Sequence, residues 1–285
     1  MARSEGKDLA VLAQCEGGHY DGRAGVWETH TDNADAARPL FTEPRRVANG
    51  VMLNKPTVLK DGRWLLPCAL WEKDFAVIAG AGHPELDGEI GANIYVSCDE
   101  GESFHYESGV RIPDRMCDEH SVVECRDGTL WLLSRTSRGI GQAFSRDGGK
   151  SWEDAGHSGI SGPNSRFNVT RLKNGELLLI NHVNPTNVLR EKKWKKRDNL
   201  MAMLSEDDGK SWRGGLMLDV RTDVSYPDVT EGEDGRICAI YDRDRFHEKE
   251  ILMCVFRPED VKAGYFVSAD AVMRRVISKA AGTKE

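Results

Sequence analysis

The sequence of 285 residues lacks several features that would place it in a class at once. No apolar run approaches the ~18 residues that a membrane-spanning helix needs. Basic charge is scarce: 39 Lys and Arg stand against 46 Asp and Glu, a net charge of −7. This argues against nucleic acids and membranes as partners. The first residues, MARSEGKDLAVLAQ, contain no apolar core of a secretory signal. We therefore expect a cytoplasmic protein, or a secreted one whose leader lies outside this sequence.

Linear motifs for cofactors and metals are also lacking. The seven Cys are scattered without a CxxC pair, which excludes the usual zinc spacing and a disulfide framework. The sequence has no Gly-rich phosphate loop, no HExxH and no Gly-x-Ser-x-Gly. We expect no required cofactor. Calcium is compatible with the sequence, because it binds carbonyl and carboxylate oxygens without a linear motif.

A short pattern, Ser-x-Asp-x-Gly-x-Ser-aromatic, is present instead and recurs along the chain. Copies occupy Ser97–Phe104, Ser145–Trp152 and Ser205–Trp212, with a weaker candidate near residues 31–41. In such a turn the Asp can accept backbone N–H bonds, the Gly permits a positive φ, and the aromatic residue packs between neighbouring sheets. We therefore assign these turns a structural role.

A second pattern precedes these turns. Two apolar runs flank an Asp-Gly or Asn-Gly at residues 56–70, 121–135, 168–182 and 228–242. This arrangement indicates a β-hairpin, for which we expect a type I′ turn with two positive φ angles. With the strand and turn that follow, each unit is a meander of four strands. Its repeat of about 45 to 65 residues is typical of a propeller blade.

The sequence therefore predicts an all-β fold, a β-propeller of four-stranded antiparallel blades, with six blades or five. One domain would cover residues 1–285, and the first blade would lack a strand because the chain opens at the run 9–14. Residues 269–281 are the main helix candidate. A β-sandwich is the alternative, but sandwiches do not repeat their sequence at this period. The expected blades lie near 1–50, 51–112, 113–162, 163–222 and 223–265, followed by a tail, 266–285.

Meander geometry brings loop residues of every blade to one mouth of a propeller, where binding sites concentrate. We expect a ligand site there, against the alternative of ordinary charged surface loops. The connectors 72–92 and 184–199 should border it, and the basic run 192–197 is either a lid over an anionic glycan or a solvated loop. The polar candidates are Glu16, His19, Arg23, Asn54, Lys55, Glu72, Asp118, Glu119, His120, Arg135, Arg166, Asn168, His182, Tyr226, Asp228, Asp242, Arg243 and Arg245.

The three Ser-x-Asp-x-Gly turns behind Asp-Gly hairpins resemble the Asp-box (BNR) repeats of the sialidase superfamily, over roughly residues 20–265. The resemblance implies an exo-acting glycoside hydrolase that removes an acidic sugar from a glycan. Sialidases hold the sugar carboxylate with Arg residues, and a Glu activates a Tyr nucleophile. By this resemblance, Tyr226 would be the nucleophile, Glu119 its base, and Arg135 and Arg166 the ligands of the sugar carboxylate. Asp228 or Asp118 is the candidate proton donor.

Further substrate contacts are expected from Asn54, Lys55, Asp118, His182, Arg243 and Arg245. Two other functions stay open. A lyase or rhamnosidase-like propeller would act on uronate-containing glycans through His120 or His182, since a histidine of near-neutral pKa can move a proton. A non-catalytic propeller would bind a glycan without turnover. Each candidate also has a structural interpretation, such as an ion pair between Glu119 and Arg135.

Overall fold

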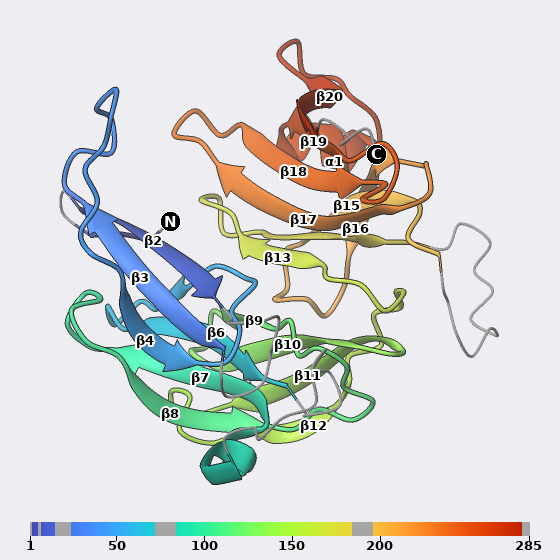
Figure 1. The fold of residues 1–285 in the computed structure, drawn as a ribbon. Helices are drawn as coiled ribbons and strands as arrows, with labels where there is room; N and C mark the ends of the chain where they lie inside the picture. The colour runs from blue at the N-terminus through green and yellow to red at the C-terminus, as the bar shows by residue number, and fades with distance from the viewer. Residues whose placement is uncertain (1, 5–6, 15–23, 72–83, 184–195, 281–285) are drawn as a thin grey trace. The chain divides into compact units, whose positions relative to one another are not determined.

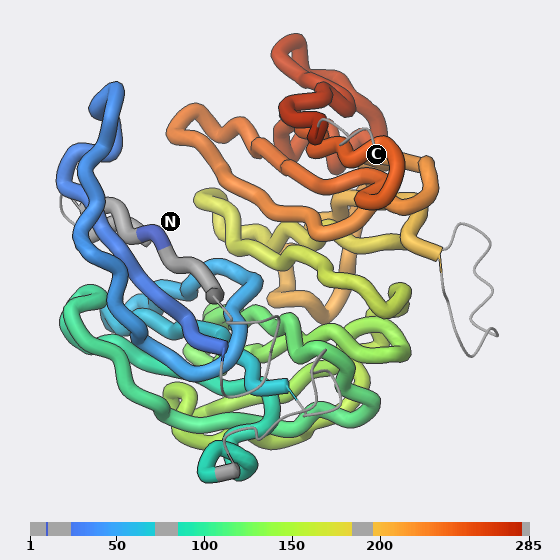
Figure 2. Tube along the Cα trace, viewed as in Figure 1, coloured from blue at the N-terminus to red at the C-terminus, as the bar shows by residue number. Residues whose placement is uncertain are grey.

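The computed structural model describes residues 2–4, 7–14, 24–71, 84–183 and 196–280, and within them five four-stranded antiparallel sheets (Figure 1). In each sheet the four strands neighbour one another in chain order, so the Cα trace runs up and down as a meander (Figure 2). This is the all-β, propeller-like class that the repeats predict.

Three sheets belong to the first part of the chain. The first contains β1 (Ala2–Ser4), β2 (Lys7–Gln14), β3 (Gly25–Thr31) and β4 (Arg45–Asn49). The second contains β5 (Thr57–Val58), β6 (Trp64–Leu70), β7 (Gly91–Ser97) and β8 (His105–Val110), with the 3₁₀ helix η3 (Pro84–Glu89) before β7. The third contains β9 (Ser121–Glu124), β10 (Leu130–Thr136), β11 (Gly139–Ser145) and β12 (Glu153–His157).

Two sheets follow. The fourth contains β13 (Asn168–Arg171), β14 (Leu177–His182), β15 (Leu200–Ser205) and β16 (Arg213–Asp219). The fifth contains β17 (Val224–Glu231), β18 (Ile237–Arg243), β19 (Glu250–Phe256) and β20 (Val272–Lys279), with helix α1 (Pro258–Ala263) between its last two strands. None of the helices in the described part of the chain has the length and apolar character that crossing a membrane requires.

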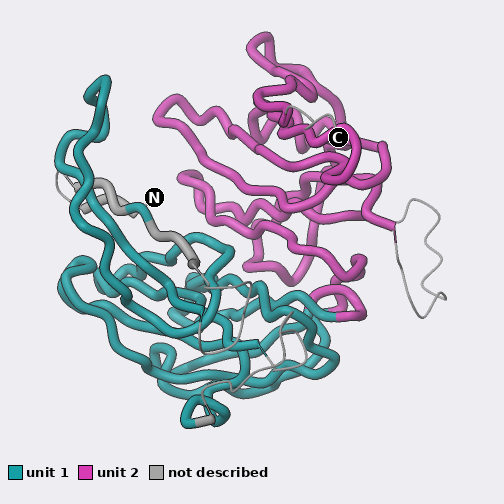
Figure 3. The backbone as a smooth tube through the Cα atoms, viewed as in Figure 1, with its two compact units in different colours: residues 1–136, 141–158 teal, residues 137–140, 159–285 magenta. Residues whose placement is uncertain are grey.

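The chain divides into two compact units (Figure 3). Unit 1 comprises residues 1–136 and 141–158, and unit 2 comprises residues 137–140 and 159–285. The single domain expected from the sequence stays a prediction.

Apolar faces hold consecutive sheets together inside each unit. In unit 1, Val26 and Leu66 share a buried cluster between the first two sheets, while Ile94 and Leu132 share another between the second and third. In unit 2, side chains such as Ile180 and Tyr241 form one core between the fourth and fifth sheets. The second sheet packs against the first and the third, and its strand β6 is buried along its whole length.

The Asp-Gly and Asn-Gly hairpins form as predicted, but with a different turn. Gly62, Gly128, Gly175 and Gly235 have positive φ angles, whereas the preceding Asp or Asn residues do not, so the turns are not type I′. Gly62 donates to Leu59 O at 3.0 Å and Leu59 donates to Arg63 O at 2.8 Å, which closes a three-residue turn with a left-handed Gly. The Asp61 carboxylate accepts the Arg63 N–H at 3.0 Å, which supports a turn with one positive φ, at Gly62.

The Ser-x-Asp-x-Gly turns have the predicted local chemistry. In the first of them Ser97 Oγ donates to Asp99 Oδ1 at 2.8 Å, and the same carboxylate oxygen accepts the Ser103 N–H at 2.9 Å. The hydroxyl and backbone of Ser103, with Ser97, lower the pKa of Asp99 to about 2. Gly101 has φ +92°. These bonds lie within each turn, which agrees with a structural role.

Two expectations about the chain ends were wrong. The first sheet has four strands, because β1 pairs with β2 as Ala2 opposite Leu9. At the other end, residues 272–279 form a strand and not a helix, so the fifth sheet reaches into the segment expected as a tail. The segment forms a strand because it pairs with the open edge of β19, with Glu250 opposite Lys279 and Val255 opposite Val272. Pairing to a neighbouring strand overrides the helical periodicity of so short a segment.

Candidate functional site

In unit 2, Tyr226 has an unusual backbone. It lies in β17 at a register shift between Ser225 and Asp228, and its φ is +56°. A left-handed conformation costs a residue with a side chain roughly 1–2 kcal/mol, and strands tolerate it mainly at bulges. The bulge interrupts the alternation of β17, whose regular pairing with β18 resumes at Asp228. Such strained positions cluster at functional sites.

Three guanidinium groups surround the ring of Tyr226. The Cζ atoms of Arg245, Arg197 and Arg166 lie 4.0, 5.8 and 5.9 Å from the ring centroid. A cation over an aromatic face is attracted by the ring quadrupole, most strongly at the distance of Arg245. The three positive charges repel one another, however, so an anion bound among them would relieve that repulsion.

Two carboxylates and a hydroxyl hold these arginines. Asp242 pairs with Arg245, and it accepts the Ser225 hydroxyl at 2.7 Å. Arg245 Nη2 and Arg197 Nη1 both approach Ser225 Oγ, at 3.2 and 3.4 Å. Although burial works against it, the hydrogen bond and the charge of Asp242 raise the pKa of Arg245.

Asp228 is the second carboxylate of this cluster. Its Oδ1 lies 3.8 Å from Arg166 Nη2 and accepts a hydrogen bond from Asn168 Nδ2 at 3.4 Å. The side chain of Arg166 is 8% exposed and that of Asp228 is 28% exposed. Among the residues described here, three guanidinium groups thus face two carboxylates. Planar guanidinium groups of this kind can bind a carboxylate in bidentate geometry.

In unit 1, the segment Asp118–Glu119–His120 before β9 forms a buried polar cluster. Glu119 Oε2 pairs with Arg135 Nη1 of β10 at 2.8 Å. The Asp118 carboxylate accepts a bond from Arg115 Nε at 2.7 Å, and its side chain is fully buried. Glu119 and Arg135 therefore meet as the sequence pairing predicts, within a buried ion pair. Their carboxylate-binding and base roles stay predictions.

His120 has carbonyl oxygens at both ring nitrogens. Nδ1 lies 2.7 Å from the Asp118 carbonyl and Nε2 lies 2.8 Å from the Asn93 carbonyl, and the ring is buried. Burial lowers the pKa of His120, although the two carbonyl groups oppose that effect. Asn54 Nδ2 donates to the His120 carbonyl at 2.8 Å. The His120 ring thus connects the 118–120 segment to β7, and Asn54 connects it to the loop before β5, where Lys55 is half-buried.

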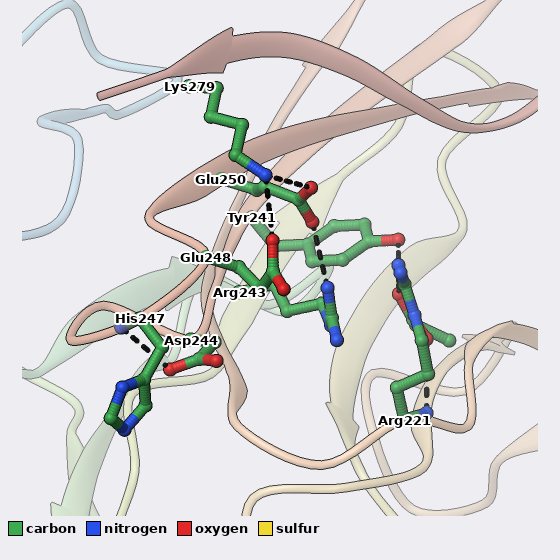
Figure 4. A network of polar contacts seen from close by, with 9 residues as sticks. Arg221, Tyr241, Arg243, Asp244, His247, Glu248, Glu250 and Lys279 are labelled. Carbon is green, nitrogen blue, oxygen red and sulfur yellow. Dashed lines mark hydrogen bonds and ion pairs between the residues drawn. The ribbon is translucent and has the colours of Figure 1, made fainter. Parts of the chain in front are cut away.

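Two other candidates of unit 2, His182 and Arg243, have partners of their own. His182, at the end of β14, is fully buried, and its Nε2 lies 2.8 Å from the Val224 carbonyl. Burial lowers the pKa of His182 to about 4. Arg243 pairs with Glu250 at 2.9 Å, and Glu250 also meets Lys279 of β20 (Figure 4). Arg243 thus belongs to a network along the fifth sheet.

The same network contains a buried pair that the sequence did not suggest. Tyr241 Oη donates to Asp219 Oδ2 at 3.0 Å, and Asp219 also accepts Arg221 Nη2 at 2.6 Å (Figure 4). Burial raises the pKa of Asp219, but the bonds from Arg221 outweigh it and hold that pKa below its ordinary value. These bonds connect β16 with β18 inside the unit 2 core.

Sequence reasoning missed Arg197 as an individual site residue. It is the last member of the basic run 192–197, and that run was its only signal. The structure brings it next to Tyr226, while Lys192, Lys193, Trp194 and Lys195 lie outside the described residues, as do Glu16, His19, Arg23 and Glu72. Within the described ranges, no three His, Cys, Asp or Glu side chains gather as metal ligands would, and the calcium site stays a prediction.

Comparison with known proteins agrees with the architecture. The fold defines a propeller-like protein built from repeated four-stranded sheets. Residues 11–238 match the family of BNR repeat-like domains, so the chain belongs to that family. No curated protein matches this sequence.

Several solved structures share the fold at low sequence identity. An intramolecular trans-sialidase from Ruminococcus gnavus is 19% identical with a TM-score of 0.60, covering 84% of this chain and 51% of that one. A Hadza microbial sialidase is 16% identical with a TM-score of 0.66, covering 90% and 51%. An exo-β-1,3-galactanase from Clostridium thermocellum is 12% identical with a TM-score of 0.51, covering 80% and 49%. The chain thus spans about half the length of these structures.

Proposed function

We propose that this chain is a glycan-acting hydrolase of sialidase type, and that unit 2 binds the carboxylate of an acidic sugar. The three guanidinium groups around the Tyr226 ring carry the proposal. Planar guanidinium groups bind a carboxylate through paired hydrogen bonds, and two of these three are pre-positioned by Ser225. Membership of the BNR repeat-like family and the sialidase and galactanase folds support a glycan as substrate.

The proposed reaction uses Tyr226 as nucleophile. Its phenol oxygen attacks the anomeric carbon, and the bond from that carbon to the leaving oxygen breaks. A base takes the phenol proton, and an acid protonates the leaving oxygen. Water then cleaves the sugar–tyrosine bond and restores the phenol. The adjacent Arg245 favours the negative charge that the phenol oxygen acquires as its proton leaves, before the bond to the anomeric carbon is complete.

Asp228 is our candidate for the proton donor. It belongs to the same unit as Tyr226 and its side chain is 28% exposed, so a substrate can reach it. The other candidate, Asp118, has a fully buried carboxylate bound by Arg115, which leaves a substrate no access to it. Glu119 as the base for Tyr226 remains a proposal from the sialidase resemblance, since the two residues lie in different units.

The alternative that works through a histidine finds little support in the geometry. His120 and His182 are buried, and a backbone carbonyl lies at hydrogen-bond distance from a ring nitrogen of each. To transfer a proton, each ring would have to give up its hydrogen bond to a backbone carbonyl and form one to the substrate. We therefore assign both histidines a supporting role.

Turnover assays test this function. Wild type, Tyr226→Phe and the control Tyr265→Phe, whose side chain is exposed in the same unit, would be compared on fluorogenic glycosides of sialic acid, a uronate and rhamnose. We expect cleavage of an acidic glycoside, with kcat at least about a hundredfold lower for Tyr226→Phe and unchanged for Tyr265→Phe. Full activity of Tyr226→Phe would exclude Tyr226 as the nucleophile. Binding without turnover by wild type would indicate a non-catalytic glycan-binding propeller.

A further inference from the structure

A hollow of about 240 Å³ lies beside the arginine cluster in unit 2. Its lining includes Arg197 and Arg245, whose guanidinium groups approach the Tyr226 ring. The other lining residues are Asp223, Ser225, Asp244, Phe246 and His247. The volume is below the roughly 300–1,000 Å³ typical of pockets for drug-sized ligands, so it suits a single small ring.

Phe246 stands out in this lining because its side chain is 85% exposed. It belongs to the turn 244–249 between β18 and β19. Asp244 and Lys249 at the two ends of the turn have positive φ angles of 47° and 53°. Lys249 donates to the Asp244 carbonyl at 2.7 Å, and Asp244 donates to the Asp223 carbonyl at 2.9 Å. A closed turn thus presents an exposed aromatic ring at a fixed place, where a ligand can cover it.

The polar side chains of the hollow define the ligand chemistry. The Asp223 and Asp244 carboxylates accept hydrogen bonds and donate none, so they suit hydroxyl groups. Their two negative charges balance those of Arg197 and Arg245 in the same lining, so the hollow as a whole favours a ring without net charge. An aromatic face beside hydroxyl-binding groups matches a sugar ring, which has an apolar C–H face and an edge of hydroxyls.

We propose that this hollow binds a neutral sugar, the unit joined to the acidic sugar that the arginine cluster holds. The inference rests on the proposed function and extends it to the second residue of the substrate. Phe246 packs on the apolar face of that sugar, while Asp223 and Asp244 accept its hydroxyl hydrogens. Phe246 is then a specificity-determining residue, since it contacts the leaving group and not the acidic sugar.

Two substrates that share one acidic sugar isolate the contribution of the hollow. Methyl α-sialoside has a leaving group too small to fill it, whereas 3′-sialyllactose offers a neutral disaccharide. Release of free sialic acid gives kcat/KM for wild type, Phe246→Ala, Phe246→Trp and the control Tyr265→Ala, whose side chain is 66% exposed in the same unit and does not line the hollow. We expect Phe246→Ala to lose roughly three- to tenfold on 3′-sialyllactose alone, and Phe246→Trp to retain wild-type values. Equal effects on both substrates, or on neither, would overturn the proposal.

A binding experiment separates this inference from the proposed hydrolase activity. Saturation-transfer NMR with lactose alone requires no turnover. We expect a lactose signal with wild type that Phe246→Ala weakens and Tyr265→Ala leaves intact. That result on a protein with no hydrolase activity would retain the sugar site and remove only the proposed reaction. A lactose signal that is absent from wild type, or unchanged in Phe246→Ala, would overturn the site whatever the activity.

Discussion

Breaking the buried ion pair between Glu119 and Arg135 should strongly destabilise unit 1. Its side chains are 1% and 8% exposed, and the two charged atoms are 2.8 Å apart. Arg135→Met would leave the Glu119 carboxylate buried beside an apolar side chain. Removing one partner of a buried pair costs about 3–5 kcal/mol, a large part of the roughly 5–15 kcal/mol that stabilises a typical domain.

Urea unfolding followed by tryptophan fluorescence measures the loss of stability in unit 1. Trp27, Trp64, Trp71, Trp131 and Trp152 lie in unit 1, and Trp131 shares β10 with Arg135, so the signal reports mainly on that unit. The control is Arg146→Met. Arg146 pairs with Glu153 at 2.6 Å in the same unit, but its side chain is 67% exposed and that of Glu153 is 53% exposed. We expect this exposed pair to contribute less than about 1 kcal/mol.

A double variant completes the measurement. Glu119→Leu combined with Arg135→Met removes both charges, and it should recover most of the stability that Arg135→Met loses, because the Glu119 charge that loses its Arg135 partner is then absent. The reasoning would be refuted if Arg135→Met lowered the free energy of unfolding no more than Arg146→Met does.

Two further effects follow from the structure. Burial lowers the pKa of His182 from 6.5 to about 4. Below pH 6.5 His182 therefore binds a proton in the unfolded chain but stays neutral in the folded protein. The free energy of unfolding then falls as the pH drops to about 4, by roughly 3 kcal/mol. His182→Gln should flatten this pH profile in urea titrations, and an unchanged slope would contradict the assignment. Gly50→Ala should cost more than about 3 kcal/mol, since φ is +84° and the new Cβ would lie 2.1 Å from the Ala69 carbonyl oxygen. Gly62→Ala, at φ +89° in open space, should cost only about 1–2 kcal/mol, and equal losses would refute the steric argument.

The repeated sheets could be predicted because their signals are local. An Asp-Gly such as Asp61–Gly62 defines a hairpin within a few residues, and a turn such as Ser97–Asp99–Gly101 closes on its own hydrogen bonds. The predicted turn type was wrong because the hairpin closes through three residues, and that turn needs a positive φ only at its Gly. Composition does not distinguish these two solutions.

The strand β20 and Arg197 could not be read from local signals. The residues of β20 are mostly exposed, so no alternation of apolar and polar side chains marks the strand, and its partner β19 determines it. Arg197 lies far from Tyr226 in sequence, and its approach to the ring depends on the packing of the fourth and fifth sheets. Tyr226, Arg166, Arg245 and Asp228 were all named from the sequence, but the bulge that gives Tyr226 its positive φ had no sequence signal.

The central claim is that the guanidinium groups around Tyr226 bind a sugar carboxylate, and calorimetric titration with a matched pair of sugars tests it most directly. N-acetylneuraminic acid carries the carboxylate, while its methyl ester has the same ring without the charge. The account predicts that wild type binds the acid at least about tenfold more tightly than the ester, because a charge-assisted bidentate contact contributes about 1.5–3 kcal/mol. Equal affinity for the two sugars, or binding of neither, would contradict it.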